Sequence, residues 1–587
     1  MSARASPQEP SSLGRREWLA LLVLTAAALA VRCLGVDRML PHFLEPDVFV
    51  AVHAGELRGD ADLLTMVDFR ERYPSLIAHV ASALPRGPVP AVAPPGDDSL
   101  AVHLRAASMP YLQVRALSAV LSALLVPLTY LLARRSLSVR GACVAAALLA
   151  TSLLHTTHSM QARPHGIHAT LALGAVLLAE RASRRAGFAP AAGACVAAAA
   201  AVATLQTGMF VLPPLCVALF VRASSWWKGL ASAAAASAVV IAVAAPFYPA
   251  WIQVDAAGIR LAGSGGHRLD FSNFNGRGVS SAVGHLWAHD PVLLSTAAIG
   301  ALAILIGLLR ADAAALNARA RERSTWIFAS YALPYALVLA LNEETYDRFL
   351  LPLLPYCACA AAAGVVWIAR AGRVLGARGE MVLIVVLTAL PAIPAALLVR
   401  IDLAPDTFEQ TAAWLSDGWR SDARNRDPAS GAIVTTAPLV LPVRSAPPPP
   451  DVKPGTLSTG AWPWLQYQSI LDRAAPRARE YDLRMIPLDV VFRTGPEGDA
   501  ELERWLDRAE AQYAIVELSP RTVGWPMTWR LRELVQRRGE LVWSAAGESD
   551  EWRKLGPLGY QGNRAMPVRL CFASALGPQI EVYRLRR

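Results

Sequence analysis

Two carboxylates lie two residues apart in the stretch His42-Phe43-Leu44-Glu45-Pro46-Asp47, shortly after the first long apolar run. A carboxylate just outside a membrane span sits at the level of the lipid headgroups, where partial desolvation makes it a stronger base than a free Asp. Glu45 and Asp47 are therefore candidates for a general base. Ordinary solvated loop charges, or the N-cap of a helix, remain the alternative interpretation of both residues.

A basic residue is the second candidate for chemistry. Arg348 opens an apolar run directly after Glu343, Glu344 and Asp347, so we expect its guanidinium at a membrane interface. There it can bind two oxygens of a phosphate in parallel. Pairing with the neighbouring acids, or extension of the side chain to the interface without a ligand, is the alternative.

Four histidines form two HxxH pairs around a short polar turn, at His155, His158, His165 and His168. A spacing of three residues puts each pair on one face if the segment is helical. This pattern leaves a divalent metal site open, but histidines that hydrogen-bond locally at the interface are the favoured interpretation. The sequence predicts no other cofactor.

The stretch 263–278 is rich in Gly and Asn and contains aromatic residues, which suits a mobile lid or a sugar contact as well as a flexible connector. It is not a GxGxxG motif and follows no strand pattern, so it is not read as a nucleotide-binding loop. The polar candidates for substrate contact are Tyr73, His165, His267 and Asn273.

The composition indicates the elements that must position these residues. The 587-residue chain is 54% hydrophobic and 17% charged, which excludes most water-soluble folds and indicates repeated membrane spans. Its net charge of +10 is spread over short Arg clusters between apolar runs, not over one basic face, so no nucleic-acid partner is predicted. Seven scattered cysteines without CxxC spacing argue against a disulfide framework.

These features predict a polytopic α-helical membrane protein with about 11 transmembrane helices. We interpret the first apolar run as an uncleaved span and not as a signal peptide, because many more spans follow. The expected spans are 18–35, 112–133, 140–155, 166–181, 188–205, 207–222, 228–246, 291–310, 325–342, 349–369 and 381–400.

Lys and Arg concentrate in alternate connections between these runs, which orients the chain in the plasma (inner) membrane. Residues 1–17 then form a cytoplasmic tail, and 18–400 form the transmembrane domain. The loops 36–111 and 247–290 face the extracytoplasmic side. An odd number of spans places residues 401–587 on that side as well.

Beyond Asp402 the sequence becomes more polar and contains a Pro-rich tract at 447–450. Short β-like runs alternate with amphipathic helical patterns, which predicts a soluble α/β domain of 401–587. The β-like runs are 432–436, 513–517, 540–543 and 580–584, and the helical patterns are 406–418 and 500–512.

Several stretches, in this order and topology, carry a resemblance to a known family: His42–Asp47, Tyr73-Pro74-Ser75-Leu76, the second span from Arg115 to Arg135, Gln161–His165, Thr204–Pro214 and Arg348–Pro355. Over roughly residues 15–400 the chain resembles the GT-C superfamily of membrane glycosyltransferases. The similarity is to the branch with protein O-mannosyltransferases and bacterial aminoarabinose transferases.

The resemblance implies a glycosyltransferase that moves a hexosyl or pentosyl group from a polyprenyl-phosphate-linked donor to a lipid, glycan or protein acceptor outside the cytoplasm. Asp47 occupies the position of the family's acidic residue in the first loop, with Glu45 as the neighbouring alternative. Arg348 and Arg163 are then the expected contacts to the donor phosphate. Membrane lipids surround the spans.

Two positions depart from the family pattern. The family often has Asp-Glu in the first loop, whereas Val48 follows Asp47 here. It also often has an acidic residue after Arg-Pro in the second outer loop, where this chain has His165. A transporter or flippase of lipid-linked substrates, or a non-catalytic scaffold with the GT-C fold, are the alternative functions.

Overall fold

The structure is a computed structural model of the chain. It describes residues 14–40, 42, 49–58, 74–85, 100–185, 187–248, 252–255, 258–261, 274–310, 323–343, 345–372, 376–421, 432–436, 439, 441, 483–486, 495–518, 526–556, 558 and 565–586. The statements below concern these residues.

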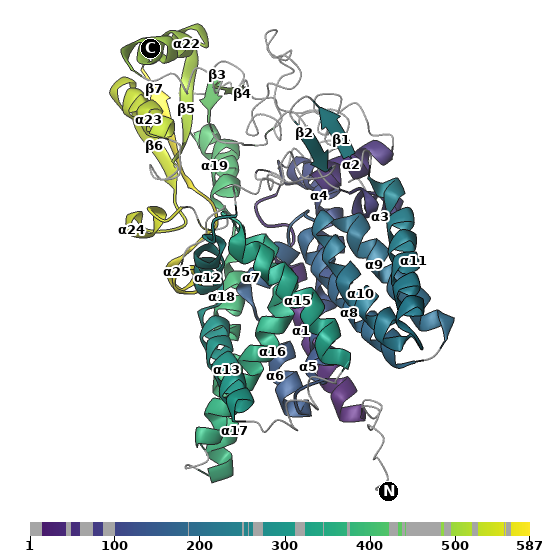
Figure 1. Cartoon of the computed structure of the whole chain (residues 1–587). Coiled ribbons are helices and arrows are strands. Elements are labelled where there is room, and N and C mark those ends of the chain that lie inside the picture. Colours follow the sequence, from purple (N-terminus) through teal and green to yellow (C-terminus); the bar gives the residue numbers. More distant parts are fainter. Residues whose placement is uncertain are drawn as a thin grey trace, which may run out of the picture.

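Long apolar helices make up most of the described chain (Figure 1). Each expected span coincides with a helix or with consecutive helices. In chain order these are α1 (Arg15–Leu34), α4 (Leu100–Ala123) with α5 (Leu125–Ala133), α6 (Val139–Ala150), α8 (His165–Arg184), α9 (Phe188–Thr204), η3 (Gln206–Val211) with α10 (Leu212–Arg222), α11 (Trp226–Ala244), α13 (Pro291–Leu309), α15 (Arg323–Leu341), η6 (Asp347–Leu353) with α16 (Leu354–Ala371), and α17 (Gly376–Ala389) with α18 (Ala392–Asp402).

Seven helical segments of the described chain are long and apolar enough to cross a membrane. An eighth is added if α6 and α7 (Leu153–Ser159), which are bent by 53° at their junction, form one span. α9 and the segment Gln206–Arg222 are apolar but shorter. The polytopic membrane class is therefore confirmed, while the number of about eleven spans stays a prediction.

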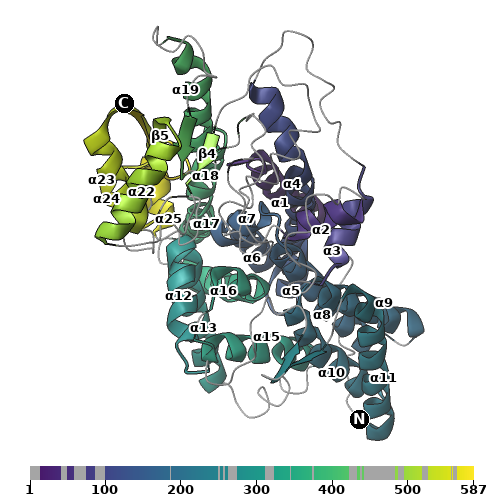
Figure 2. The same ribbon diagram turned by 90° about the horizontal axis from the view of Figure 1, so that it is seen from above.

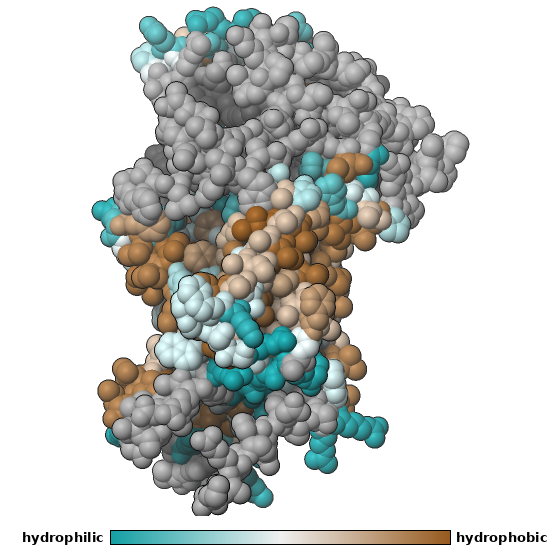
Figure 3. Space-filling view, turned by 45° about the vertical axis from the view of Figure 1, so that its right-hand side comes forward, coloured by the Kyte–Doolittle hydropathy of each residue, from teal (hydrophilic) through white to brown (hydrophobic). Residues whose placement is uncertain are grey.

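The outer surface of the helices is apolar. Leu22 of α1, Leu302 of α13 and Leu337 of α15 are each more than half exposed. Figure 3 shows apolar residues forming a belt across one face of the molecule, with hydrophilic residues below it. Such a belt is stable only where hydrocarbon replaces water, so these side chains face the lipid.

Small residues let two of the helices approach closely. A side chain at Gly300 of α13 would collide with the backbone of Ala360 in α16, and one at Gly364 would collide with the backbone of Thr296. Close backbone approach at small residues is a common way to pack helices in lipid, where no hydrophobic effect drives association. The α13–α16 pair therefore depends on both glycines.

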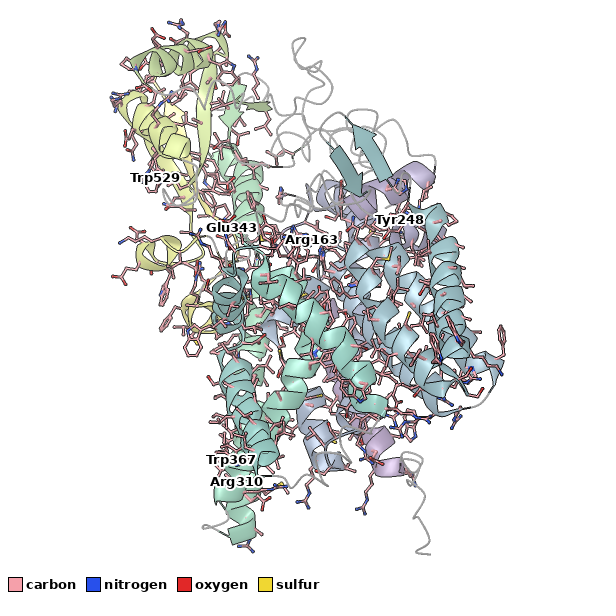
Figure 4. The ribbon with its side chains drawn as sticks, in the orientation of Figure 1. Arg163, Tyr248, Arg310, Glu343, Trp367 and Trp529 are labelled. Carbon is pink, nitrogen blue, oxygen red and sulfur yellow. The ribbon has the colours of Figure 1, made fainter. Side chains whose placement is uncertain are left out.

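Helix α1 begins at one end of the helix bundle, and strands β5 and β7 lie beyond the other end (Figure 1). Arg310 lies at the end where α1 begins, whereas Arg163, Tyr248 and Glu343 lie at the other end (Figure 4). Arg163, Tyr248 and Glu343, which lie in three separate connections between the spans, therefore share one end of the spans. We call this end the upper end, as it is drawn in Figure 1.

The two long loops contain more structure than the sequence predicted. The first holds α2 (Phe49–Leu57) and α3 (Leu76–Ala83), and α4 begins at Leu100, well before the expected start of the second span at 112. The second holds the antiparallel strands β1 (Ile252–Asp255) and β2 (Gly258–Leu261), followed by α12 (Gly278–His289). Such short elements lack the long periodic pattern by which the sequence predicts helices.

The C-terminal residues form the expected α/β structure. A five-stranded sheet has the order β4-β3-β5-β7-β6, in which β3 pairs in parallel with β4 and β5, and β7 pairs antiparallel with β5 and β6. Seen from above, this part lies to one side of the bundle, away from α2 and α3 (Figure 2). Its elements are α19 (Thr407–Ser421), β3 (Ala432–Thr435), β4 (Leu483–Met485), α22 (Pro496–Arg508), β5 (Ala511–Leu518), α23 (Pro526–Arg538), β6 (Gly539–Ala545), α24 (Asp550–Arg553), α25 (Met566–Phe572) and β7 (Gln579–Leu585).

All four β-like runs and both helical patterns expected after residue 401 are confirmed as β3, β5, β6, β7, α19 and α22. Strand β4 and helices α23 to α25 were not predicted. β4 has only three residues, which is too short to show alternation. Helix α23 carries many Arg residues and has no apolar run, because only one narrow face packs on the sheet.

Candidate functional site

Helix α7 supplies the first part of the site, and a carboxylate from another helix holds it in place. Asp290, which precedes α13, accepts hydrogen bonds from the Ser152 hydroxyl (2.6 Å) and from the backbone N–H groups of Leu153 (2.8 Å) and Leu154 (3.2 Å). These groups form the first turn of α7, where a negative charge is favourable. Burial raises the pKa of Asp290 above its usual range, although these hydrogen bonds act in the opposite direction.

The last turn of α7 carries His158, which contacts the start of η6. Its Nε2 lies 3.4 Å from Oδ2 of Asp347, and its Nδ1 lies 3.0 Å from Oε1 of Gln161. The other oxygen of Asp347 accepts a hydrogen bond from the backbone N–H of Arg348 at 2.8 Å. Asp347 therefore joins an imidazole from one outer turn to the arginine of another.

Three basic side chains meet beside this pair. His165 begins α8 and is almost fully buried, as is Arg163 in the turn before it. Both Arg163 and Arg348 lie close enough to the His165 imidazole for their charges to act on it. The rings of His165 and Phe349 have their centroids 5.7 Å apart. We call Arg163, His165 and Arg348 the basic cluster.

Aromatic rings orient the guanidinium of Arg348. Its Cζ lies 4.4 Å from the ring centroid of Tyr346 and 5.2 Å from that of Phe349. An arginine that contacts two aromatic rings keeps its charge and its hydrogen-bond donors while losing conformational freedom. The side chain is thereby held in place at the start of η6.

Helix α12 brings two more histidines to the same carboxylate. Burial lowers the pKa of His285, and the negative charge of Asp347 opposes this effect. The neighbouring His289 is buried and contacts the carbonyl of His285 through Nδ1 at 3.0 Å. Asp347 is therefore surrounded by imidazoles from α7 and α12, and Arg348 follows it in the chain.

The start of the first outer loop is fixed close to α7. Arg38 donates to the carbonyl of Thr157 at 3.1 Å, and its other terminal nitrogen lies 3.9 Å from Oδ1 of Asp402 at the end of α18. Arg115 of α4 donates to the carbonyl of Arg38 at 2.8 Å. The chain that leads to Glu45 and Asp47 therefore departs next to the residue that precedes His158.

The structure brings together three of the residues expected from the sequence, Arg163, His165 and Arg348. The other candidates, Glu45, Asp47, Tyr73, His267 and Asn273, lie outside the described residues. Sequence reasoning missed the contact of His158 with Asp347. The available signals were the HxxH spacing and an acid next to Arg348, but the sequence does not show that the two turns meet.

Three of the four histidines of the HxxH pairs contact different partners. His155 lies 2.5 Å from a terminal nitrogen of Arg32, while His158 contacts Asp347, and His168 contacts the Thr207 hydroxyl at 3.2 Å. Within the described ranges, no three His, Cys, Asp or Glu side chains are arranged to hold a metal ion. His155, His158 and His168 therefore each have a polar partner within the protein.

The arrangement has two chemical capacities. The basic cluster can neutralise an anionic group such as a phosphate, because two guanidinium groups offer several donors each. The His158–Asp347 pair can hold or move a proton beside that cluster, since Asp347 also contacts the backbone N–H of Arg348. Both lie at the upper end of the spans, where a lipid headgroup would be located.

Comparison with known proteins adds solved structures. No family model and no curated protein sequence matches the chain. The oligosaccharyltransferase of Archaeoglobus fulgidus in the apo form shares 12% identity at a TM-score of 0.44, covering 85% of this chain and 69% of its own. Archaeoglobus fulgidus AglB, in complex with an inhibitory peptide and a dolichol-phosphate, shares 12% identity with this chain at a TM-score of 0.46. The match covers 90% of this chain and 73% of AglB.

A third solved structure is ArnT from Cupriavidus metallidurans bound to undecaprenyl phosphate. It shares 12% identity with this chain at a TM-score of 0.42, and the match covers 97% of this chain and 98% of ArnT. All three of these matches have 12% identity and a TM-score below 0.5.

Proposed function

We propose that the chain is an integral-membrane glycosyltransferase, which moves a hexosyl or pentosyl group from a polyprenyl-phosphate donor to a lipid, glycan or protein acceptor. The observation that carries this proposal is the basic cluster beside the His158–Asp347 pair. Arg163 and His165 from the turn that begins α8 converge with Arg348 of η6 at the end of a membrane bundle. A phosphate attached to a lipid chain suits such a place in both charge and depth.

Arg348 and Arg163 are the proposed contacts to the donor phosphate. In the reaction, the acceptor oxygen forms a bond to the anomeric carbon of the sugar while the bond from that carbon to the phosphate oxygen breaks. The leaving polyprenyl phosphate gains negative charge as the bond breaks. Fixed guanidinium groups therefore stabilise the transition state more than the ground state.

Asp47, with Glu45 as the alternative, is the proposed base that takes the proton from the acceptor hydroxyl. This role rests on the sequence resemblance and on the departure of the first loop from beside α7, where Arg38 contacts Thr157. Tyr73, His165, His267 and Asn273 are proposed contacts to the sugars. The chain is proposed to lie in the plasma (inner) membrane with this end, and residues 401–587, outside the cytoplasm.

Donor-phosphate binding tests the proposal directly. Undecaprenyl phosphate is added to the purified chain in lipid nanodiscs, and bound lipid is counted by native mass spectrometry. We expect Arg348→Ala to weaken binding by about 10- to 100-fold, as for loss of a hydrogen bond to a charged group. Arg348→Lys should recover part of the affinity, because it keeps the charge and loses the planar fork.

A matched control lies at the same end of the bundle. Arg277 is 74% exposed in its side chain and pairs with Glu343 at 3.3 Å. Arg277→Ala should leave binding unchanged, because an exposed pair contributes little. If Arg348→Ala bound undecaprenyl phosphate as tightly as the native chain, the phosphate site would be elsewhere. Binding without sugar transfer in the native chain would favour a transporter or a scaffold instead.

A further inference from the structure

Helix α12 turns apolar side chains away from the protein. Val279, Val283 and Trp287 are 53%, 48% and 60% exposed, and their spacing of four residues puts them on one face. The opposite face is covered, since Gly278 and His289 are buried. A helix that faces water normally has the reverse arrangement, with its polar residues outside.

Helix α25 repeats this arrangement in the C-terminal part of the chain. Val568 and Phe572 are 49% and 69% exposed, whereas Leu570 is fully buried. The one charged residue of the helix, Arg569, also points inward. Its Nε donates to Oε1 of Glu548 at 2.8 Å, and its Nη2 contacts the second oxygen of the same carboxylate. The polar side of α25 is therefore inside and its apolar side is outside.

The two helices lie next to each other where the spans end. α25 packs against α12 and α18, and Arg400 of α18 donates to the carbonyl of Ala573 at 3.3 Å. α12 leads directly into the apolar helix α13. Figure 1 shows α12, α18 and α25 together at the upper end of α13.

We infer that the apolar faces of α12 and α25 are embedded in the boundary between lipid headgroups and acyl chains. These faces consist of Val279, Val283, Trp287, Val568 and Phe572 and are here named the interfacial surface. This contact seats the C-terminal part of the chain on the bilayer. A tryptophan and a phenylalanine beside the end of a span are typical of this zone, where an amphipathic or apolar ring is more stable than in water.

Continuity with the lipid-facing surface of the spans identifies the bilayer as the occupant. Leu302 of α13 and Ile393 of α18 are 56% and 57% exposed, and Leu403 at the end of α18 is 62% exposed. Helix α13 directly follows α12 in the chain, and α18 packs against α25. The ring of Phe572 also stacks on that of Trp552 in α24, with centroids 6.3 Å apart. Exposed apolar side chains thus continue from the spans onto the C-terminal elements.

A spin label on α25 measures this contact. Cys571 and Cys33 are exposed cysteines. In the full chain with Cys33→Ser, a nitroxide is attached to native Cys571, which requires no change on α25. The chain is placed in nanodiscs of phosphatidylethanolamine and phosphatidylglycerol. Collision rates with oxygen, which concentrates in lipid, and with a water-soluble nickel chelate are then compared.

The matched control is Leu541 on strand β6, which is also about half exposed in the C-terminal part. It is labelled as Leu541→Cys with Cys571→Ser and Cys33→Ser. We expect oxygen to collide more often than the nickel chelate at 571, and the reverse at 541. Equal exposure to the nickel chelate at both positions would overturn the inference. Protection from both reagents at 571 would also overturn it, since it would indicate a protein contact.

Discussion

Asp347→Asn is the substitution that best separates binding from chemistry at the proposed site. The change keeps the shape of the side chain and removes its charge. Asp347 contacts His158 at 3.4 Å and accepts from the N–H of Arg348 at 2.8 Å. Hydrogen bonds to a charged group contribute about 1.5–3 kcal/mol, so loss of one such bond should lower kcat by about 10- to 150-fold.

Donor binding should change in the opposite direction. A negative charge next to the basic cluster repels a phosphate, so its removal should leave the affinity for undecaprenyl phosphate unchanged or increase it. The two effects separate in an assay that follows release of undecaprenyl phosphate from a radiolabelled donor, alongside the binding measurement. A fall in kcat with equal or tighter binding is the expected result.

Glu343→Gln provides the control, because Glu343 is an acid of the same outer turn whose pair with Arg277 is largely exposed. It should change kcat by no more than about fivefold, since exposed pairs contribute at most about 1 kcal/mol. If Asp347→Asn weakened binding and left kcat unaltered, Asp347 would only orient Arg348 toward the lipid. If neither value changed, the His158–Asp347 pair would have no part in the reaction.

Three further substitutions test positions that hold the elements together, each by thermal or proteolytic unfolding of the full chain in detergent. Burial raises the pKa of Asp290 in the folded state, so protonation of this carboxyl favours the folded state. The native chain should therefore gain stability relative to Asp290→Asn as the pH falls from about 7 to about 4. A gain in stability with rising pH would contradict the burial argument. The side chain of Gly300→Val would collide with the backbone of Ala360, so this change should lower the free energy of unfolding by about 2 kcal/mol. An unchanged melting temperature would show that α13 and α16 can move apart without loss of stability. Arg569→Met leaves the carboxylate of Glu548 buried without this partner and should lower the free energy of unfolding by about 3–5 kcal/mol. The loss is measured as faster proteolysis of the C-terminal part. Adding Glu548→Gln should restore part of the stability.

The helices of the bundle were predictable because their signal is local. A span needs about 20 consecutive apolar residues, and such runs stand out even in an Ala-rich sequence. The strands β5 and β7 were found for a similar reason, since each has a run of buried residues. The elements that were missed, β1, β2 and β4, have only three or four residues each and are defined by pairing, which no local pattern contains.

The candidate site was only partly predictable. Arg348 and Arg163 were recognisable because each lies in a short polar segment between apolar runs. The pairing of His158 with Asp347 was not, because nearly 190 residues separate them in the sequence and the bend between α6 and α7 decides where His158 points. The cap from Asp290 on α7 was missed for the same reason, since it joins helices that are distant in the chain.

The Arg38–Asp402 ion pair makes one part of the protein dependent on another. Arg38 lies at the start of the first outer loop, and Asp402 is the last residue of α18, where the C-terminal part begins. A truncation or a domain exchange placed just before Asp402 would take the carboxylate away from the side chain that also contacts Thr157. Removal of the C-terminal part would therefore take away one contact of Arg38, which lies at the start of the loop that carries Asp47. This would hold even if the C-terminal part never touches a substrate.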